Sequence, residues 1–247
     1  MNNNAYRPFS GMPPVTLNLL IINILAYIVK IVLMSKYEYD ISNILGLRFF
    51  LSNDFHWYQL FTYMFIHGNE THIFFNMFAL FMFGPLLERL WGAKKFLFYY
   101  FVCGLGAALT QFVFFYYKIQ PAMDELRQIH EQIMNVPNAA EQSRYLIDWM
   151  AKRNEIYDSS ITIGASGAIY GLLAAYGVLF PNIYFYIYFF IPIKAKWFVI
   201  LYGAIELFTG VFMEDNVAHF AHLGGMLFGI ILVLIWRKKQ RQYDYFV

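Results

Sequence analysis

Long apolar runs, separated by short polar segments, dominate this chain of 247 residues. A helix needs roughly 20 mainly apolar residues to cross the ~30 Å hydrocarbon core of a bilayer. Six runs qualify, and each predicts a transmembrane helix: residues 15–34, 71–90, 96–117, 161–180, 196–213 and 217–236. The pattern therefore predicts an all-α membrane protein folded as a bundle of six transmembrane helices.

Two further apolar stretches do not fit this description. Residues 57–66 are too few to cross a bilayer alone, and residues 182–193 are dense in Tyr, Phe and Ile but are bracketed by Pro181 and Pro192. Aromatic side chains favour the membrane interface. We expect both stretches to lie at the interface or in loops, and a seventh span at 182–193 is the alternative.

One sizeable hydrophilic segment, residues 118–160, separates the third and fourth predicted spans. Residues 124–134 and 141–154 have helical periodicity with charges at i,i+4-type spacing, which predicts a pair of short external helices and no second domain. The sequence does not indicate their role. The chain then divides into an N-terminal tail, a six-helix domain that includes this segment, and a basic tail: residues 1–14, 15–236 and 237–247.

Composition agrees with a membrane-embedded chain. Hydrophobic residues make up 60% and charged residues only 14%, against about 25% charged in a soluble domain. The single cysteine, Cys103, lies in an apolar run, so an intrachain disulfide is excluded. We expect the lipid bilayer and membrane-protein substrates as partners and expect no nucleic acid, while the oligomeric state is not indicated.

Lys and Arg in short loops predict the orientation, because such loops stay on the cytoplasmic side. Basic residues follow the second predicted span, precede the fifth and fill the tail after residue 236, whereas the loop between the fifth and sixth holds only Glu214 and Asp215. Both termini are therefore predicted to be cytoplasmic. The first run is too long for a signal-peptide core, so we expect a retained signal anchor. With no transit-peptide pattern, we expect the cytoplasmic membrane of a bacterium.

The first chemical motif is Gly164-Ala165-Ser166-Gly167 in the fourth predicted span. Ser166 is expected about five residues inside the outer end of that span, or about 8 Å deep. A packing role is the alternative, because Gly167 and Gly171 form a small-xxx-small pair that lets another helix approach closely.

The second motif lies in the last predicted span. Ala221, Gly225 and Gly229 recur every four residues and make one small-residue face, and His222 lies beside it at a depth similar to that of Ser166. The alternative for His222 is a structural hydrogen bond across the bundle. His219, one turn earlier, is expected to be structural or solvated.

The third motif consists of His67, His72 and Asn76 at the start of the second predicted span. His72 and Asn76 are four residues apart and share a helix face. A metal site is the competing interpretation, but two His and one Asn without a carboxylate or cysteine make a poor zinc set. We expect neither a metal nor a cofactor.

Together the motifs predict a catalytic site, because all three fall at a similar shallow depth on one side of the membrane. The glycine faces would let two helices approach until Ser166 and His222 form a hydrogen bond. His222 can then remove the serine proton and return it to the leaving group. His72 and Asn76 can stabilise an oxyanion. Spans four and six carry no acid in their inner parts, so we predict a dyad without a carboxylate.

These motifs resemble the rhomboid intramembrane serine proteases. The resemblance rests on the GASG string with Tyr170 four residues after the serine, on AHxxGxxxG in the last span and on HxxxN in the second. It extends to Glu88-Arg89, which is similar to an acid–base pair of the family, and covers residues 15–236.

The resemblance implies a role for each matching residue. Ser166 would be the nucleophile, His222 the base, and His72 and Asn76 part of the oxyanion site, with Tyr170 packed against the His222 ring. The substrates would be transmembrane segments cut near the outer leaflet, the loop at residues 35–56 would lie partly in the membrane, and the fifth span with the turn at 212–218 would cover the site.

One feature departs from the family pattern. Tyr58-Gln59 stands where the family often has Trp-Arg, which puts the packing of the first loop in doubt. Glu206, midway along the fifth predicted span, has no place in the scheme, and we favour a structural role for it. Two other functions remain open: a rhomboid-like binder that captures membrane helices without cutting, with Ser166 and His222 idle, and a small transporter with a polar path.

Overall fold

The computed structural model describes residues 11–187, 190–213 and 217–244. Most of the predicted N-terminal tail, the end of the basic tail and the turn that contains Glu214 and Asp215 lie outside these residues. The larger helices are α1 (Pro14–Tyr37), α4 (Glu70–Trp91), α5 (Ala93–Met134), α6 (Ala139–Asp158), α7 (Ser166–Leu179), α8 (Ala195–Phe212) and α9 (His219–Asp244). The shorter elements are α2 (Ser42–Leu45), β1 (Leu47–Arg48), α3 (Gln59–Thr62), η1 (Tyr63–Phe65), β2 (Ile161–Thr162), β3 (Tyr184–Ile187) and β4 (Ile191–Lys194).

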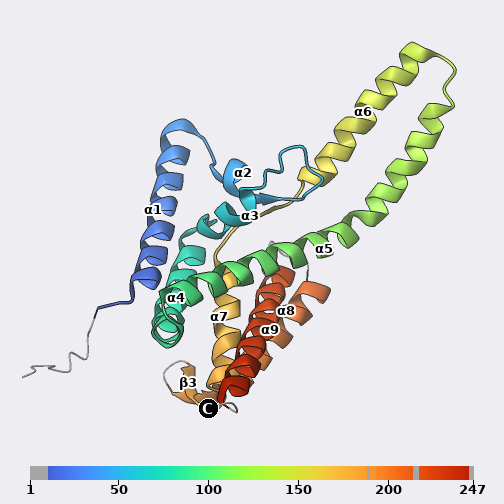
Figure 1. Cartoon of the computed structure of the whole chain (residues 1–247). Coiled ribbons are helices and arrows are strands. Elements are labelled where there is room, and N and C mark those ends of the chain that lie inside the picture. Colours follow the sequence, from blue (N-terminus) through green and yellow to red (C-terminus); the bar gives the residue numbers. More distant parts are fainter. Residues whose placement is uncertain (1–10, 188–189, 214–216, 245–247) are drawn as a thin grey trace, which may run out of the picture.

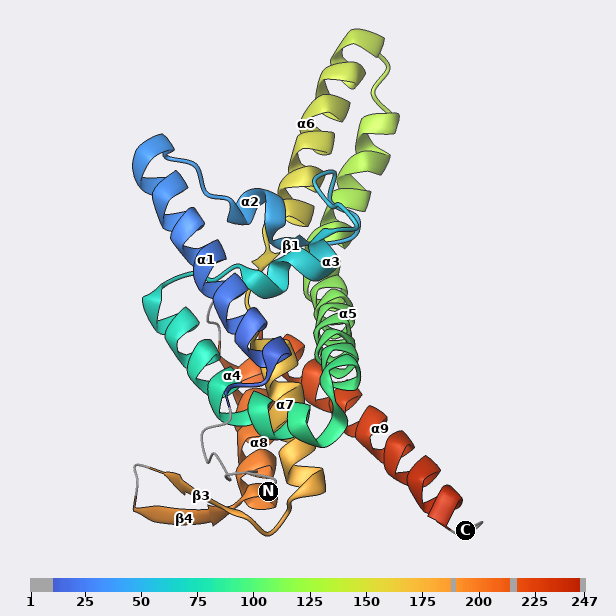
Figure 2. The ribbon, with the colours of Figure 1, turned by 60° about the vertical axis from the view of Figure 1, so that its left-hand side comes forward.

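The prediction of an all-α membrane bundle is confirmed. Five of the described helices, α1, α4, α5, α8 and α9, are long and apolar enough to cross a membrane. The fourth predicted span corresponds to α7, which is apolar but shorter at 14 residues. Figures 1 and 2 show these helices as one bundle, with the α5–α6 hairpin projecting from one end and the β3–β4 hairpin lying at the other.

The predicted start of the fourth span is wrong. Residues 161 and 162 form β2, which pairs antiparallel with β1 through Leu47↔Thr162 and Arg48↔Ile161. Gly164 then adopts a left-handed φ of 121°, and helix α7 begins at Ser166. Ser166 is therefore the first residue of its helix and does not lie five residues inside it.

Of the two predicted external helices, one is confirmed and the other is not a separate helix. Helix α6 covers residues 141–154, but residues 124–134 are the continuation of α5, which runs unbroken past Pro121. An apolar face keeps this part of α5 in place, because Ile119, Met123 and Leu126 are buried together with Phe49 of the first loop. Packing on that face offsets the backbone hydrogen bond that proline removes.

The other two ambiguous stretches are not spans. Residues 182–193 contain β3 and β4, which pair antiparallel as a hairpin, so the alternative of a seventh transmembrane helix is wrong. Residues 57–66 contain the short helices α3 and η1. Both stretches connect larger helices, as the sequence predicted.

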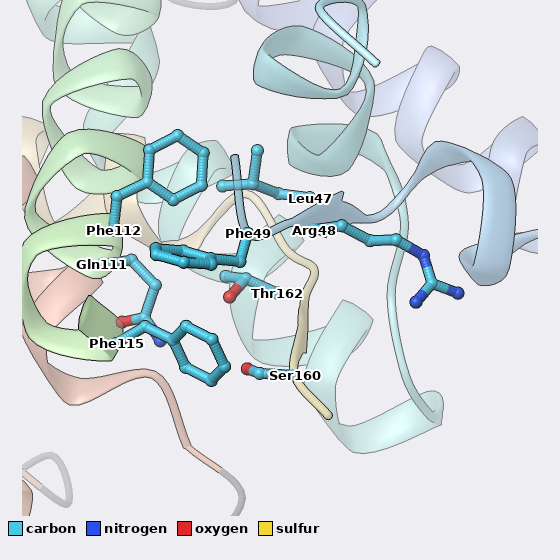
Figure 3. A pocket seen from close by; sticks show the side chains of 8 residues that line it. All are labelled: Leu47, Arg48, Phe49, Gln111, Phe112, Phe115, Ser160 and Thr162. Carbon is cyan, nitrogen blue, oxygen red and sulfur yellow. The ribbon is translucent and has the colours of Figure 1, made fainter. Parts of the chain in front are cut away.

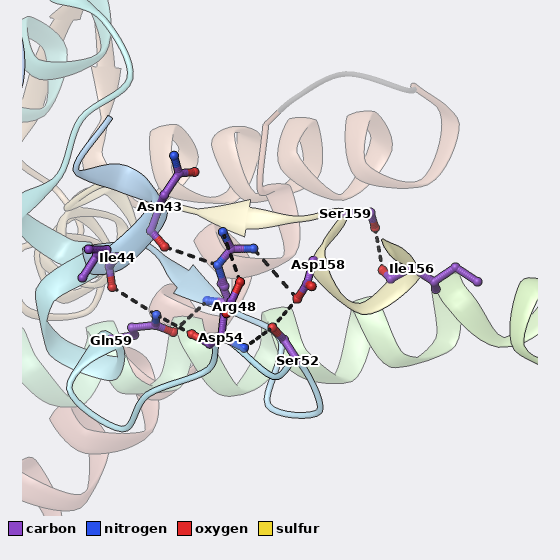
Figure 4. Close-up of polar contacts among 9 residues, drawn as sticks. All are labelled: Asn43, Ile44, Arg48, Ser52, Asp54, Gln59, Ile156, Asp158 and Ser159. Carbon is purple, nitrogen blue, oxygen red and sulfur yellow. Dashed lines mark hydrogen bonds and ion pairs between the residues drawn. The ribbon is translucent and has the colours of Figure 1, made fainter. Parts of the chain in front are cut away.

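The first loop is held by a polar network around Gln59, one of the two residues that depart from the family pattern. The Gln59 side chain is fully buried. It accepts a hydrogen bond from the Arg48 backbone N–H at 3.3 Å and donates to the carbonyl groups of Ile44 and Asp54 at 3.1 and 3.0 Å (Figure 4). Buried polar groups of a loop need such partners, so Gln59 supplies the loop packing that the missing Trp-Arg pair put in doubt.

The same loop is tied to the end of α6. The Arg48 guanidinium lies 3.9 Å from the Asp158 carboxylate, and the Ser52 hydroxyl donates a hydrogen bond to Asp158. Figure 3 shows a small pocket where Phe49, Phe112 and Phe115 meet at this junction. Its volume of about 10 Å³ has room for no more than about one water molecule, so it is not a ligand site.

Helices α5, α7 and α9 form the centre of the bundle. Phe96, Tyr99 and Tyr100 of α5 are fully buried there, and the Tyr99 hydroxyl donates to the Gly171 carbonyl of α7 at 2.7 Å. At the edge of the bundle, the Glu88 carboxylate of α4 accepts hydrogen bonds from the first backbone N–H groups of α1, at 2.9 and 2.7 Å. An acid at a helix N-terminus satisfies donors that have no intrahelical partner.

Candidate active site

Ser166 and His222 lie within hydrogen-bonding distance of each other. Ser166 begins α7 and His222 lies one turn into α9, and the Ser166 Oγ is 2.7 Å from the His222 Nε2. The His222 side chain is only 12% exposed. The two helices predicted to carry a nucleophile and a base therefore bring an alcohol and an imidazole into direct contact.

Glycine makes this contact possible, because α7 and α9 approach backbone to backbone. A Cβ atom added to Gly225 of α9 would lie 1.9 Å from the Gly167 carbonyl oxygen of α7, a distance at which no side chain fits. Small residues permit such close approach between membrane helices. The packing alternative stated for the first glycine motif is therefore compatible with the contact between Ser166 and His222.

The imidazole of His222 is also stacked on an aromatic ring. Tyr170 lies one turn after Ser166 on α7, and its ring is 4.3 Å from that of His222 with an interplanar angle of 4°. The stacking restricts rotation of the imidazole ring about the Cβ–Cγ bond of His222. The sequence resemblance implied this contact between Tyr170 and His222.

His72 of α4 faces the same site. Its Nδ1 accepts a hydrogen bond from the Gly68 backbone N–H at 3.3 Å, so in the neutral ring the proton lies on Nε2. A Cβ atom added to Gly164 would lie 2.7 Å from that Nε2 and 3.6 Å from the Ser166 Oγ. The His72 N–H donor is therefore beside Gly164 and close to Ser166.

Asn76 and His67 flank His72 on either side along the chain. Asn76 is buried, and its Nδ2 donates to the His72 carbonyl at 3.0 Å. His67, in the loop before α4, is fully buried with its ring edge-on to His72 at 5.0 Å. Burial, and then the charge of His72, lowers the pKa of His67 to about 3, so His67 is neutral at physiological pH.

Glu206 of α8 completes a hydrogen-bonded cluster behind His222. One carboxylate oxygen, Oε2, lies 2.9 Å from the His222 Nδ1 and 2.6 Å from the His219 Nδ1. The other, Oε1, accepts a hydrogen bond from the Tyr170 hydroxyl. The His219 Nδ1 is also 3.1 Å from the Thr209 hydroxyl.

This cluster corrects two predictions from the sequence. The expectation of a His222 without a carboxylate neighbour is wrong, because the acid comes from the fifth predicted span and not from the fourth or sixth. Glu206 therefore contacts the site. His219 is buried against Glu206, which agrees with the structural role that was one of the two options for it. The position of Glu206 inside a predicted span could have revealed its pairing with His222. A charged residue within the membrane needs a polar partner, and His222 is a polar residue in another span.

The donor atoms of Glu206, His219 and His222 all lie within 4.8 Å of one another, and two His with one Glu are a ligand set that zinc uses. The spacing is that of hydrogen bonds, however. Two ligands of a tetrahedral zinc, each about 2.1 Å from the ion, stand about 3.4 Å apart, whereas these Nδ1–Oε2 distances are 2.9 and 2.6 Å.

A broad open cleft of about 2600 Å³ leads to these residues. Ser166, Tyr170, His72, Asn76 and His222 all line it. Aromatic side chains from α4 and α8 line it as well: Phe74, Phe75, Phe78, Phe198 and Tyr202. The volume exceeds the roughly 300–1,000 Å³ of a small-molecule pocket, and its apolar walls suit a larger apolar occupant.

The fold and site define a multi-pass membrane protein with a serine–histidine pair inside its helix bundle. A family model described as the Rhomboid domain matches residues 54–239, and the chain belongs to this family. It is 27% identical over 242 residues to the rhomboid protease AarA of Providencia stuartii, covering 92% of this chain and 73% of that relative.

A second relative, the putative rhomboid protease YdcA of Bacillus subtilis (strain 168), is 27% identical over 190 residues, which cover 76% of this chain and 71% of the relative. A shorter match to the rhomboid protease GluP of the same organism is 34% identical over 58 residues, covering 24% and 11%. Membership of the rhomboid family, and with it the assignment as an enzyme of the rhomboid protease class, is confirmed.

Proposed function

We propose that this chain is a serine endopeptidase that cuts transmembrane segments of other membrane proteins, with Ser166 as nucleophile and His222 as general base. The observation that carries the proposal is the 2.7 Å contact between the Ser166 Oγ and the His222 Nε2. The hydroxyl is a weak nucleophile until a base removes its proton. His222 accepts that proton as Oγ attacks the scissile carbonyl, and returns it to the departing amine.

The oxyanion that forms in this step needs preorganised donors. The His72 Nε2–H beside Gly164 and the Asn76 amide are two side-chain candidates. The Ser166 backbone N–H is a third, because the first N–H groups of a helix have no intrahelical acceptor and the positive end of the helix dipole lies there. The site thus supports both nucleophilic attack and charge stabilisation.

The substrate proposal follows from the cleft. Its volume and its aromatic walls suit an apolar polypeptide segment better than a small molecule. A backbone must be extended to be attacked, so the segment is expected to unwind at the site, near the outer leaflet in a bacterial cytoplasmic membrane. The transporter alternative needs a path of polar residues through the full depth of the membrane. Glu206 is bonded to His219 and His222 and so belongs to the same cluster, which weakens that alternative.

Labelling with a fluorophosphonate tests whether Ser166 is an activated nucleophile. The wild-type protein in detergent is expected to be labelled, and Ser166→Ala is expected to lose the label completely. Ser160→Ala is the matched control, because Ser160 lines the same cleft but lies before α7. Labelling of Ser166→Ala at the wild-type rate contradicts the proposal. A folded wild type that is never labelled would favour the non-proteolytic binder.

Substitution of the oxyanion candidates should slow the reaction without stopping it. His72→Ala and Asn76→Ala are each expected to lower kcat by about 10²–10³, the usual loss for one oxyanion donor. Phe78→Ala, on the same helix and the same cleft, is a control that removes no donor. A loss confined to KM, with kcat unchanged in both variants, would assign these residues to substrate binding instead.

A further inference from the structure

Glu206 is surrounded by hydrogen-bond donors from two neighbouring helices. The Tyr170 hydroxyl of α7 donates to its Oε1, and the Nδ1 atoms of His219 and His222 of α9 lie 2.6 and 2.9 Å from its Oε2. Thr209, one turn further along α8, reaches the His219 Nδ1. A buried carboxylate stays ionised only when it is paired and hydrogen-bonded in this way.

The bonds of Glu206 determine where the protons of His222 lie. An ionised carboxylate can only accept hydrogen bonds, so the His222 Nδ1 carries a proton. In the neutral imidazole the Nε2 then has a free lone pair, and this atom is 2.7 Å from the Ser166 Oγ. That is the tautomer a general base requires, and Glu206 selects it.

We propose that Glu206 is a positioning residue for catalysis, which makes the site a Ser166–His222–Glu206 arrangement and not a dyad. The inference rests on the proposed function and deepens it. Glu206 is not among the residues that line the cleft, and it acts through its bond to His222. Its hydrogen bond to Nδ1 holds one edge of the His222 imidazole, and the stacked Tyr170 ring holds one face of it.

The same carboxylate stabilises the charge that forms during the reaction. As the bond forms between the Ser166 Oγ and the carbonyl carbon, the hydroxyl proton moves to the His222 Nε2 and the imidazole becomes cationic. When the peptide bond breaks, that proton leaves with the amine. Glu206 remains ionised throughout, and its attraction for the imidazolium is strong because the Glu206 carboxylate is buried.

A purely structural role for Glu206 makes a different prediction. Glu206 is one of three buried residues of α8, with Ala195 and Val199, and its bonds link α8 to α7 and α9. A linking role predicts lower thermal stability for any variant that loses the bonds. A positioning role predicts a lower kcat at unchanged KM, even in variants that remain folded.

The experiment compares Glu206→Gln and Glu206→Asp with wild type in the full chain, using a reporter transmembrane substrate in proteoliposomes. Glutamine keeps the shape of glutamate but lacks its charge. Its amide N–H can donate to the His222 Nδ1, which favours the tautomer with the proton on Nε2, where His222 cannot act as a base. We expect kcat and the fluorophosphonate labelling rate to fall at least about 10²-fold, with KM within about twofold. Aspartate restores the charge and is expected to recover part of kcat.

Glu88→Gln is the matched control. It makes the same substitution at another buried carboxylate in a membrane helix, one that binds the first N–H groups of α1 and lies outside the cleft residues. It is expected to lower the unfolding temperature and leave the kcat of the folded protein unchanged. Comparison of the two variants thus distinguishes a loss of thermal stability from a loss of catalytic rate.

A wild-type kcat in Glu206→Gln overturns the inference and leaves the proposed function standing. If Glu206→Gln does not fold, Glu206→Asp decides: unchanged kcat in its folded fraction overturns the inference, and a reduced kcat at wild-type KM supports it. A folded wild type that neither cleaves nor is labelled refutes the proposed function, and the inference fails with it.

Discussion

Ser166→Ala and His222→Ala are each expected to abolish cleavage of a reporter transmembrane substrate, with a loss of about 10⁴–10⁶ in kcat. The reason is the single contact between these residues, because removing either partner leaves no activated nucleophile. The double variant should be no slower than the single ones, since residues that act as a unit lose their effect together. Initial rates in proteoliposomes measure all three.

The control for this prediction is a histidine that shares the cluster but does not contact Ser166. His219 binds the same carboxylate oxygen as His222, yet the atom facing Ser166 belongs to His222. His219→Ala should therefore retain far more activity than His222→Ala. Equal losses in both variants, at equal folded fractions, would mean that the cluster acts through stability and not through base catalysis.

Periodic apolar runs and spaced motifs were enough to predict the helix bundle and the contact between Ser166 and His222. The spans around α1, α4, α5, α8 and α9 could be read because a bilayer imposes a minimum apolar length. The meeting of Ser166 and His222 could be anticipated because glycine at four-residue spacing on two helices predicts close approach. Both arguments use local pattern alone.

Features that depend on pairing between distant segments were not accessible in the same way. The start of α7 is determined by β2 pairing with β1, more than a hundred residues earlier in the chain, and by the left-handed Gly164. The part of α5 beyond Pro121 is buried in a cluster that joins Met123 and Leu126 to Phe49 of the first loop. The partners of Glu206 could not be predicted because they lie on other helices, and sequence spacing does not reveal which helix faces which.

Gly225→Ala is expected to have the largest effect on stability, about 3–5 kcal/mol, which is a large part of a typical total of 5–15 kcal/mol. The added Cβ would lie 1.9 Å from the Gly167 carbonyl oxygen, and that backbone atom cannot rotate away. The two helices must then separate by more than about 1 Å, a misplacement that itself can cost about 10² in rate. Thermal unfolding in detergent and kcat of the remaining folded protein measure the two effects.

Gly203→Ala supplies the comparison, because it adds the same methyl group to a helical glycine of α8. A Cβ atom there would meet the Met226 Cε at 3.4 Å, an ordinary contact with a flexible side chain. Alanine also has a higher helix propensity than glycine, by about 1 kcal/mol, so this variant should be neutral or slightly stabilised. Equal unfolding temperatures for the two variants would show that α7 and α9 do not approach so closely. Ser166 and His222 would then need some other arrangement to meet, since their contact depends on that approach.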